Sequence, residues 1–407
     1  MLEKLIKFHS KIYANFVLRF KRVSSVEEIY SVIKSLDEPV ALYVHIPFCK
    51  SQCKYCTFLK FDYHPDTLKR YFACLRSEFD KYLSLGARFS EIYIGGGTPT
   101  IDLAELVAFI SYAKAKCGVD DISVETILED ASVENLQALK QVGVTRLSIG
   151  LQSVHQSYRA LMERKGLDTD QAREKINQAS AIFDTVNVDF IFNLPGQTKD
   201  ELGQDVDFFL SLDEVKGTFY PLMPTDVKQS GIFSRVNLKK QRNYYYFIKD
   251  TLRARGFEPL TTWCFSKNGQ ASSEYIVNSD NYIGIGSGAI SQVNRTIYIN
   301  TFSLEKYCPM IKKGLPVVLK KVISGRDAAR YRLLLALFGT KIEKATIKNN
   351  NFHLLPELLL ARLLGLVRDD GKTLRATRKG MYYIGFTMRE FFNSVSDLRK
   401  NFINKGL

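Results

Sequence analysis

Short apolar runs alternate with longer amphipathic stretches between residue 40 and about residue 222. In the longer stretches the apolar residues recur at helical spacing, which predicts helices, and the short runs between them predict strands. Such an alternation predicts parallel strands joined by right-handed crossovers. The predicted strands are 41–45, 91–94, 122–126, 146–151, 187–192 and 218–222. The predicted helices are 65–85, 103–116, 133–142, 171–183 and 199–212. We therefore expect an α/β fold, a partial (β/α)6 TIM-like barrel.

The first 38 residues have a different pattern from the alternation that follows. Two amphipathic stretches, 2–20 and 26–36, carry apolar residues at helical spacing. The first stretch is also basic, so it could lie on a membrane surface, but packing on the next domain is the expected role.

The pattern changes again beyond residue 324. Two helical stretches are followed by two short strands around an Asp-Asp-Gly turn, which predicts a small winged-helix-like α+β unit. These elements are 327–337, 358–364, 366–368 and 373–377. The predicted domains are an N-terminal helical extension (1–38), a barrel with active-site loops (39–310) and a C-terminal winged-helix-like domain (311–407).

Glycines and polar side chains stand where the predicted strands end. Active residues in barrels of this kind lie at the carboxyl ends of the strands. The second strand ends in Gly95-Gly96-Gly97-Thr98-Pro99-Thr100, whose glycines would let a ligand approach the backbone amides. Glu125, Gln152 and Asp189 come at or near the ends of the next three strands. Burying a polar group without a partner is costly, so together these residues predict one binding site at the barrel mouth.

Three cysteines follow the first predicted strand within eight residues. Cys49, Cys53 and Cys56 have the spacing C-x3-C-x2-C. Soft thiolates select iron-sulfur clusters, copper(I) or zinc. A structural zinc site closes with four ligands, and no fourth Cys or His stands nearby at a usual spacing. A [4Fe–4S] cluster held by three cysteines would leave one iron open to a substrate or cofactor.

The composition is that of a globular protein, with 45% apolar and 25% charged residues among 407. No apolar run has the length that spans a bilayer, and the first residues lack the apolar core of a signal peptide. The four remaining cysteines, Cys74, Cys117, Cys264 and Cys308, are far apart and show no disulfide framework. We therefore expect a reducing, cytoplasmic location.

Basic residues outnumber acidic ones by 57 to 43, a net charge of +14. This excess favours anionic partners such as nucleic acid, an acidic membrane surface or a substrate with several carboxylates, or it reflects a generally basic surface. No basic cluster has the pattern of a nucleic-acid-binding module, so no nucleic-acid partner is expected.

The stretch from Tyr43 to Phe58, Y-V-H-I-P-F-C-K-S-Q-C-K-Y-C-T-F, resembles the radical S-adenosylmethionine (radical SAM) superfamily. Within it, the Y-x-H-I-P-F-C opening and Tyr55 are similar to the oxygen-independent coproporphyrinogen III oxidase-like branch, which includes haem chaperones and methyltransferases. The resemblance covers about residues 40–390. It implies a [4Fe–4S] cluster on Cys49, Cys53 and Cys56, and one or two S-adenosylmethionine molecules cleaved to a 5′-deoxyadenosyl radical.

The resemblance also implies which residues surround S-adenosylmethionine. Arg164 is implied to bind the cofactor, and Lys165 is the alternative residue for this role. Gly284, Gly286 and Gly288 resemble a loop that closes over the active site. No catalytic residue is named. The implied cofactor shell is Tyr43, Tyr55, Gly96, Gly97, Thr98, Glu125, Gln152, Arg164 and Asp189.

Two departures from the branch bear on the reaction. The oxidase has a fourth cysteine two positions after the third, where this chain has Phe58. The haem chaperones carry an H-N-x-x-Y-W motif, where residues 272–277 read S-S-E-Y-I-V. Methyltransferases of the branch use a second S-adenosylmethionine and lack the extra cysteine.

Three hypotheses remain open. The first is a radical enzyme that oxidises or methylates a tetrapyrrole or similar conjugated substrate, served by an electron donor such as a flavodoxin or ferredoxin. The second is a haem-binding delivery protein. The third, least expected, is a winged-helix nucleic-acid binder with a structural cluster.

Overall fold

The computed structural model describes residues 2–17, 19–164, 166, 168–223, 236–267, 281–404 and 406. Its centre is an open sheet, in which seven neighbouring strands run parallel. In sheet order these strands are β12 (Tyr282–Ile285), β2 (Val40–Ile46), β5 (Phe89–Gly96), β6 (Ile122–Ile127), β7 (Arg146–Gln152), β8 (Thr185–Phe192) and β9 (Lys216–Pro221). The six predicted strands are β2 and β5 to β9, so the α/β fold with its parallel sheet is confirmed.

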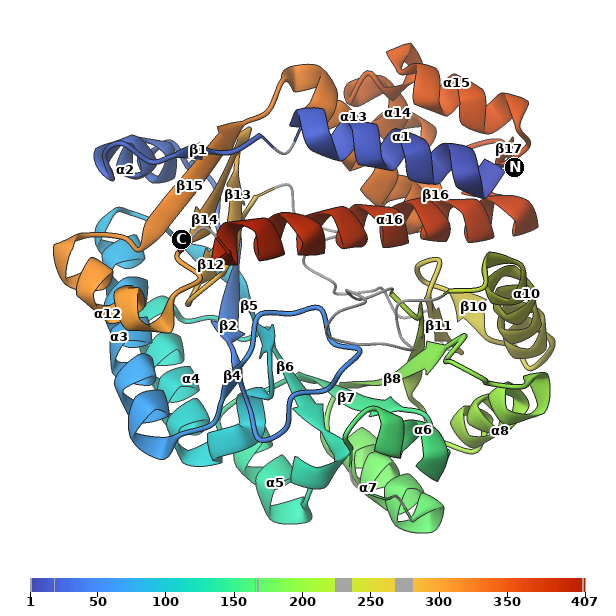
Figure 1. Cartoon of the computed structure of the whole chain (residues 1–407), viewed down its shortest axis with the longest axis horizontal. Coiled ribbons are helices and arrows are strands. Elements are labelled where there is room, and N and C mark those ends of the chain that lie inside the picture. The colour runs from blue at the N-terminus through green and yellow to red at the C-terminus, as the bar shows by residue number, and fades with distance from the viewer. Residues whose placement is uncertain are drawn as a thin grey trace.

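Helices cover the outer side of this sheet (Figure 1). They are α3 (Pro65–Ser84), α4 (Leu103–Cys117), α5 (Val133–Gln141), α6 (Gln156–Leu161), α7 (Thr169–Ile182) and α8 (Lys199–Leu210). Side-chain caps start several of them: Asp102 accepts a hydrogen bond from the Glu105 amide, and Thr198 and Glu201 form a capping box at α8. These caps fix where each crossover turns back toward the sheet.

Antiparallel strands extend the sheet at both edges. Beyond β12 come β13 (Ile290–Val293), β14 (Thr296–Asn300), β15 (Val317–Val322) and β1 (Lys21–Arg22). Beyond β9 come β11 (Cys264–Ser266) and β10 (Glu258–Pro259), which follow α10 (Leu238–Ala254). Thus β1 of the predicted N-terminal extension and β15 of the predicted C-terminal domain are both hydrogen-bonded into the main sheet. The domain boundaries themselves stay a prediction.

The C-terminal unit combines helices with a small antiparallel sheet. It contains α13 (Gly325–Phe338), β16 (Lys341–Glu343), α14 (Lys344–Asn349), α15 (Pro356–Leu363), β17 (Val367–Asp369) and β18 (Thr373–Ala376). The strand order is β16-β18-β17, as a wing with a third strand would have.

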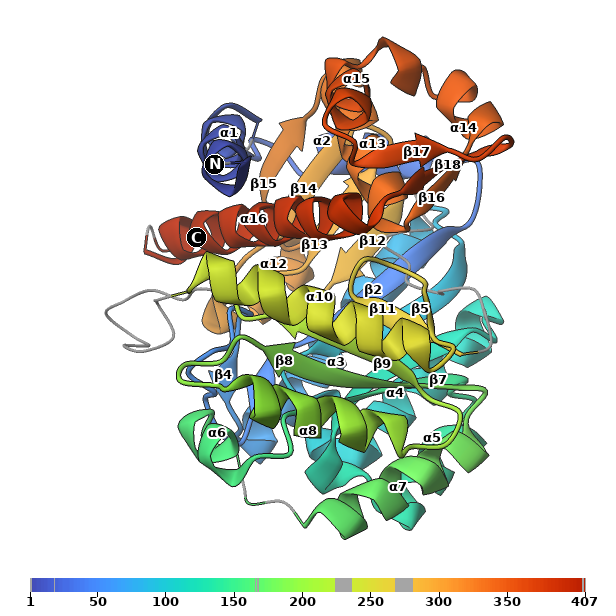
Figure 2. The same cartoon turned by 90° about the vertical axis from the view of Figure 1, so that its right-hand side faces the viewer.

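A long helix, α16 (Arg378–Ile403), follows the wing and was not predicted. It lies between the C-terminal unit and the barrel (Figure 2). The predicted helix at the N-terminus, α1 (Leu2–Val17), packs along α16, and α2 (Glu27–Lys34) lies near β15 (Figure 1). In the described part of the chain, no helix is both long enough and apolar enough to cross a bilayer.

Residues 282–288 differ from the closing loop that the resemblance implied. Gly284 lies within strand β12, and a Cβ on it would approach the Ile290 carbonyl oxygen to 2.3 Å. Gly286 has a positive φ of 105°, and its amide donates to Glu78 Oε2 at 2.8 Å. The glycines therefore serve close backbone packing in the core.

The fully buried Glu78 on α3 joins three elements. Besides Gly286 its carboxylate accepts hydrogen bonds from Asn300 Nδ2 (2.7 Å) and the Tyr307 hydroxyl. Tyr307 belongs to α12 (Leu304–Lys313). Burial raises the pKa of Glu78 to about 7, against the lowering effect of these hydrogen bonds.

The expectation that no cysteines pair is wrong for one pair. Cys74 on α3 and Cys308 on α12 form a disulfide across 234 residues of sequence. The sequence did not indicate this pair because the two cysteines are far apart along the chain, and α3 and α12 contact each other only in the folded protein. Cys117 and Cys264 form no disulfide.

Candidate functional site

The three clustered cysteines lie on a loop at the carboxyl end of β2. The loop begins at β3 (Phe48–Cys49), which pairs in parallel with β4 (Phe61–Asp62). The Phe61 amide donates to the Pro47 carbonyl at 2.6 Å, and the Cys56 amide donates to the Cys53 carbonyl at 3.2 Å. The first hydrogen bond closes the loop at its base, and the second forms a turn between the second and third cysteines.

All three thiols are free and partly exposed, and they act on one another electrostatically. Burial raises the pKa of Cys49 to about 11; the Thr98 hydroxyl lowers it, and Cys56 and Cys53 raise it further. Among the described residues, no three or more side chains of His, Cys, Asp or Glu are grouped to hold a metal ion. In an iron-sulfur cluster, by contrast, each thiolate binds a different iron. Three soft thiols on one loop fit such a donor set.

The glycine run after β5 packs directly against this loop. A Cβ on Gly97 would lie 2.6 Å from the Phe48 carbonyl oxygen and 3.0 Å from Cys49 Sγ. The amides of Gly97 and Thr98 donate to the carbonyls of Ile46 and Phe48 at 2.8 and 2.9 Å. Only glycine allows this approach, so the run brings the backbone beside the first cysteine.

Glu125, at the end of β6, supports the other side of the glycine run. Its carboxylate accepts hydrogen bonds from the Gly96 amide (3.1 Å) and the Tyr93 hydroxyl (2.8 Å). Burial raises the pKa of Glu125, and these two hydrogen bonds and Arg146 lower it. The β6 carboxylate is thus fixed beside the amides that follow β5.

Asp189 on β8 belongs to a polar network within the barrel. It accepts hydrogen bonds from Ser148 Oγ (3.0 Å) and Asn187 Nδ2 (2.8 Å). Burial and, second, the charge of Glu125 raise the pKa of Asp189 to about 7, against the lowering effect of these hydrogen bonds. The two predicted acids therefore lie within electrostatic reach of each other.

Gln152 and Arg164 meet at the carboxyl end of β7. Gln152 has a positive φ of 76° at a register shift between β7 and β8. A Cβ on Gly150 would lie 2.9 Å from Gln152 Nε2 and 3.6 Å from Arg164 Nη2. Lys165, the rival of Arg164, lies outside the described residues, as do residues 272–277.

Arg164 links the barrel to the cysteine loop. Its Nη1 donates to the Gly150 carbonyl at 2.7 Å, and its Nη2 donates to the Tyr55 hydroxyl at 3.1 Å. Its Nε is buried without a hydrogen-bond partner. Burial acts to lower the pKa of Arg164, but Tyr55 and Cys53 outweigh it, so the pKa is raised. The guanidinium remains charged, and its Nε can donate to one further acceptor.

Tyr43 lies on β2 beside a histidine that sequence reasoning did not assign. The Tyr43 hydroxyl and His45 Nδ1 are 2.8 Å apart, and the Tyr71 hydroxyl donates to the His45 carbonyl at 2.7 Å. Burial, followed by the charge of Arg399, lowers the pKa of His45 to about 3. His45 is therefore a neutral imidazole at ordinary pH.

Sequence reasoning also missed two arginines at this site. Arg146, only 6% exposed at the start of β7, stacks on the Tyr93 ring at 5.8 Å. Its position at the start of an otherwise apolar run was a signal in the sequence that could have identified Arg146 as a buried polar residue. Arg399 comes from α16 and donates to the Thr57 carbonyl at 2.7 Å, across 342 residues. No local pattern pointed to that contact.

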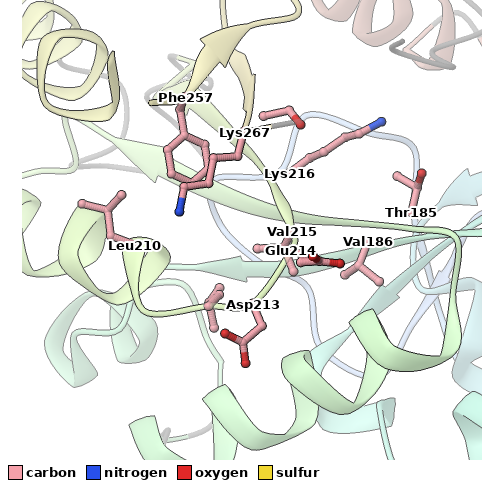
Figure 3. A pocket seen from close by; sticks show the side chains of 11 residues that line it. Thr185, Val186, Leu210, Asp213, Glu214, Val215, Lys216, Phe257 and Lys267 are labelled. Atoms are coloured by element: carbon pink, nitrogen blue, oxygen red, sulfur yellow. The ribbon is translucent and has the colours of Figure 1, made fainter. Parts of the chain in front are cut away.

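The structure brings the predicted residues together at one end of the parallel sheet. They come from the carboxyl ends of β2, β5, β6 and β7, from β8, and from the cysteine loop. Their binding roles stay a prediction. A separate cavity of ≈ 230 Å³, lined by Thr185, Asp213, Lys216 and Phe257 among others, lies at the opposite, amino ends of β8 and β9 (Figure 3). It is not part of this site.

The model of the radical SAM superfamily matches residues 43–209, which run from β2 through α8. These residues therefore form a radical SAM domain. The relatives of this chain support the coproporphyrinogen III oxidase-like branch of the superfamily.

Two curated relatives and one solved structure support that branch. The chain is 29% identical to the heme chaperone HemW of Bacillus subtilis (strain 168) over 297 residues, covering 67% of this chain and 76% of HemW. It is 23% identical to anaerobilin synthase of Escherichia coli O157:H7, covering 84% and 81% of the two chains. The solved structure of coproporphyrinogen III oxidase (HemN) from Escherichia coli superposes with a TM-score of 0.77, at 19% identity, over 92% of this chain and 95% of that chain. That superposition shows the radical SAM fold.

Proposed function

We propose that this radical SAM protein is an enzyme that cleaves S-adenosylmethionine and takes hydrogen from a tetrapyrrole or similar conjugated substrate. The supporting observation is that Arg164, at the end of the barrel, donates to Tyr55 of the cysteine loop and still has an unpartnered Nε. A cationic donor beside the three thiols suits a ligand that carries a carboxylate and binds at a cluster.

Each cofactor-shell residue has a role in this proposal. Arg164 binds a carboxylate of S-adenosylmethionine through its free donor and its charge. Glu125 and Asp189 accept hydrogen bonds from the amino or hydroxyl groups of the cofactor. Gly96, Gly97 and Thr98 bring the backbone close enough for contact. Tyr43 and Gln152 line the rest of the cofactor site.

The cysteines hold the cluster in this proposal. Cys49, Cys53 and Cys56 would hold the cluster through their thiolates, one fewer than the usual four cysteines, so a position would be left for the cofactor. When bound, the reduced cluster supplies the electron that cleaves S-adenosylmethionine. The protein's own contribution is to position the cofactor. Helix α16, which lies between the C-terminal unit and the sheet (Figures 1 and 2), reaches the cysteine loop through the contact of Arg399 with the Thr57 carbonyl.

Haem delivery is the second candidate function. It is favoured by the relationship to HemW, which is described as a heme chaperone. Under this alternative the fold and the cluster remain, and the tetrapyrrole is carried without being altered. Methyl transfer to a conjugated substrate is a variant of the first candidate, compatible with Phe58 in place of a fourth cysteine.

Anaerobic reconstitution separates these functions. The protein is loaded with iron and sulfide, then incubated with S-adenosylmethionine, dithionite and haem, and the products are measured by mass spectrometry. 5′-Deoxyadenosine alone indicates oxidation, and 5′-deoxyadenosine with S-adenosylhomocysteine indicates methyl transfer. Tight haem binding with no cleavage supports delivery.

Cys53→Ala tests the cluster itself. Two thiolates should not retain the cluster, so this variant should lose iron and cofactor cleavage. Cys117→Ala is the matched control, because Cys117 is a free cysteine at the end of α4, outside the cysteine loop. Full iron content in Cys53→Ala would refute the proposal.

A further inference from the structure

The last helix of the chain reaches the cysteine loop. Arg399 lies in the carboxyl-terminal half of α16, and its Nη1 donates to the Thr57 carbonyl at 2.7 Å. Thr57 directly follows Cys56. A side chain from the C-terminal end of the fold therefore holds the backbone next to the third predicted cluster ligand.

The guanidinium of Arg399 is not fully used by this contact. Its Nε is buried and has no hydrogen-bond partner. It also lies over the ring of Phe58, with 5.7 Å between the guanidinium carbon and the ring centroid. A buried cationic donor without a partner costs free energy unless a nearby negative charge compensates. The residues that face Arg399 therefore indicate which negative charge compensates it.

The groups that face Arg399 belong to the cysteine site. Burial lowers the pKa of Arg399, and Tyr43 and Cys56 raise it. Two other cations contact the same loop. Lys60, which is part of the loop, donates through Nζ to the Cys53 carbonyl, and Arg164, which follows α6, donates to Tyr55. Arg399 adds a third cation from helix α16, and its side chain donates to the Thr57 carbonyl.

We propose that Arg399 is a positioning residue that raises the reduction potential of a cluster on Cys49, Cys53 and Cys56. The inference rests on the proposed function, since it needs the cluster. Reduction adds one electron, supplied by a donor of the flavodoxin or ferredoxin class, and hence one negative charge. A fixed cation stabilises the more negative state more strongly, and cluster potentials follow local charge, hydrogen bonding and solvent exposure.

Substitution at position 399 tests this inference by potentiometric titration, with the reduced cluster followed by electron paramagnetic resonance. Arg399→Gln removes the charge and Arg399→Lys keeps it. Arg378→Gln is the matched control: Arg378 is on the same helix, 21 residues earlier and therefore about 32 Å away along the axis. Arg378 pairs with Asp250, far beyond the screening length of roughly 8–10 Å.

The expected result is a lower midpoint potential in Arg399→Gln, a potential near that of the wild type in Arg399→Lys, and no change in Arg378→Gln. Cluster assembly in Arg399→Lys but not in Arg399→Gln would also support the role of the charge. Three outcomes would overturn the inference while leaving the proposed function intact. They are an unchanged midpoint potential in Arg399→Gln, an equally lowered midpoint potential in Arg399→Gln and Arg399→Lys, and a shift in Arg378→Gln as large as that in Arg399→Gln. Failure of the wild type to assemble any cluster would refute both.

Discussion

The carboxylate of Glu125 accepts a hydrogen bond from the amide of Gly96 at 3.1 Å. This contact ties the end of β6 to the glycine run after β5, and the same carboxylate holds the Tyr93 hydroxyl. It fixes one wall of the candidate cofactor site, because the glycine run packs against the cysteine loop.

Glu125→Gln should weaken S-adenosylmethionine binding. The glutamine amide would place a donor against the donors Gly96 and Tyr93, and it would remove a buried charge. The loss of a charged hydrogen bond costs about 1.5–3 kcal/mol, or roughly 10- to 150-fold in Kd. Anaerobic calorimetry on the cluster-loaded protein measures this. Glu134→Gln, on the exposed face of α5, is the control, and equal affinities in the two variants would contradict the assignment.

Gly97→Ala should disturb the cysteine loop. The new methyl group would meet the Phe48 carbonyl oxygen at 2.6 Å, so the loop must move. Overpacking of this kind costs about 1–3 kcal/mol, and less iron should be bound per chain. Gly203→Ala provides the comparison, because its Cβ would meet only Phe247, at an ordinary 3.8 Å, within helix α8. Iron content and denaturant unfolding check both variants, and wild-type values for Gly97→Ala would count against the packing argument.

Glu78 should make the protein less stable as pH rises. Its pKa is raised to about 7 in the folded state from 4.5, so between these values the folded chain binds a proton that the unfolded chain releases. The free energy of unfolding should therefore fall as pH rises from about 4.5 to 7. Denaturant unfolding between pH 5 and pH 8 measures the slope. In Glu78→Gln this contribution to the slope should disappear; an unchanged slope would show that Glu78 does not titrate in this window.

The disulfide between Cys74 and Cys308 should stabilise the fold when it is oxidised. Closing a loop of 234 residues restricts the unfolded chain, and disulfides typically contribute about 2–4 kcal/mol. Cys308→Ser should unfold at a lower denaturant concentration than the wild type under non-reducing conditions. Cys117→Ser should not. Peptide mapping without reductant would detect the linked peptides, and their absence from the folded protein would refute the pairing.

The sequence predicted the barrel strands closely because buried parallel strands are continuous apolar runs. It missed β12, since Gly284 and Gly286 made residues 282–288 look like a loop. Those glycines are there because the backbone of Ile290 and the backbone of His45 come close. The need for glycine came from tertiary contacts that no local pattern displays.

The candidate site was predictable where topology alone decides it. Glu125 lies near the end of β6 and Gln152 ends β7, its parallel neighbour, so their proximity follows from strand order. Arg399 was not predictable in this way, because its contact with Thr57 depends on how α16 crosses the barrel. The pairing of Cys74 with Cys308 is the same case, since it depends on helix packing across the fold.

The 342-residue separation of Arg399 from Thr57 has a consequence for biosynthesis. At about 5–20 residues per second, a ribosome needs roughly 17–70 s to add that much chain. During this interval the three cysteines have already been synthesised, while the helix that carries Arg399 does not yet exist. A product truncated before α16 would therefore contain the three cysteines without the arginine contact at the neighbouring Thr57.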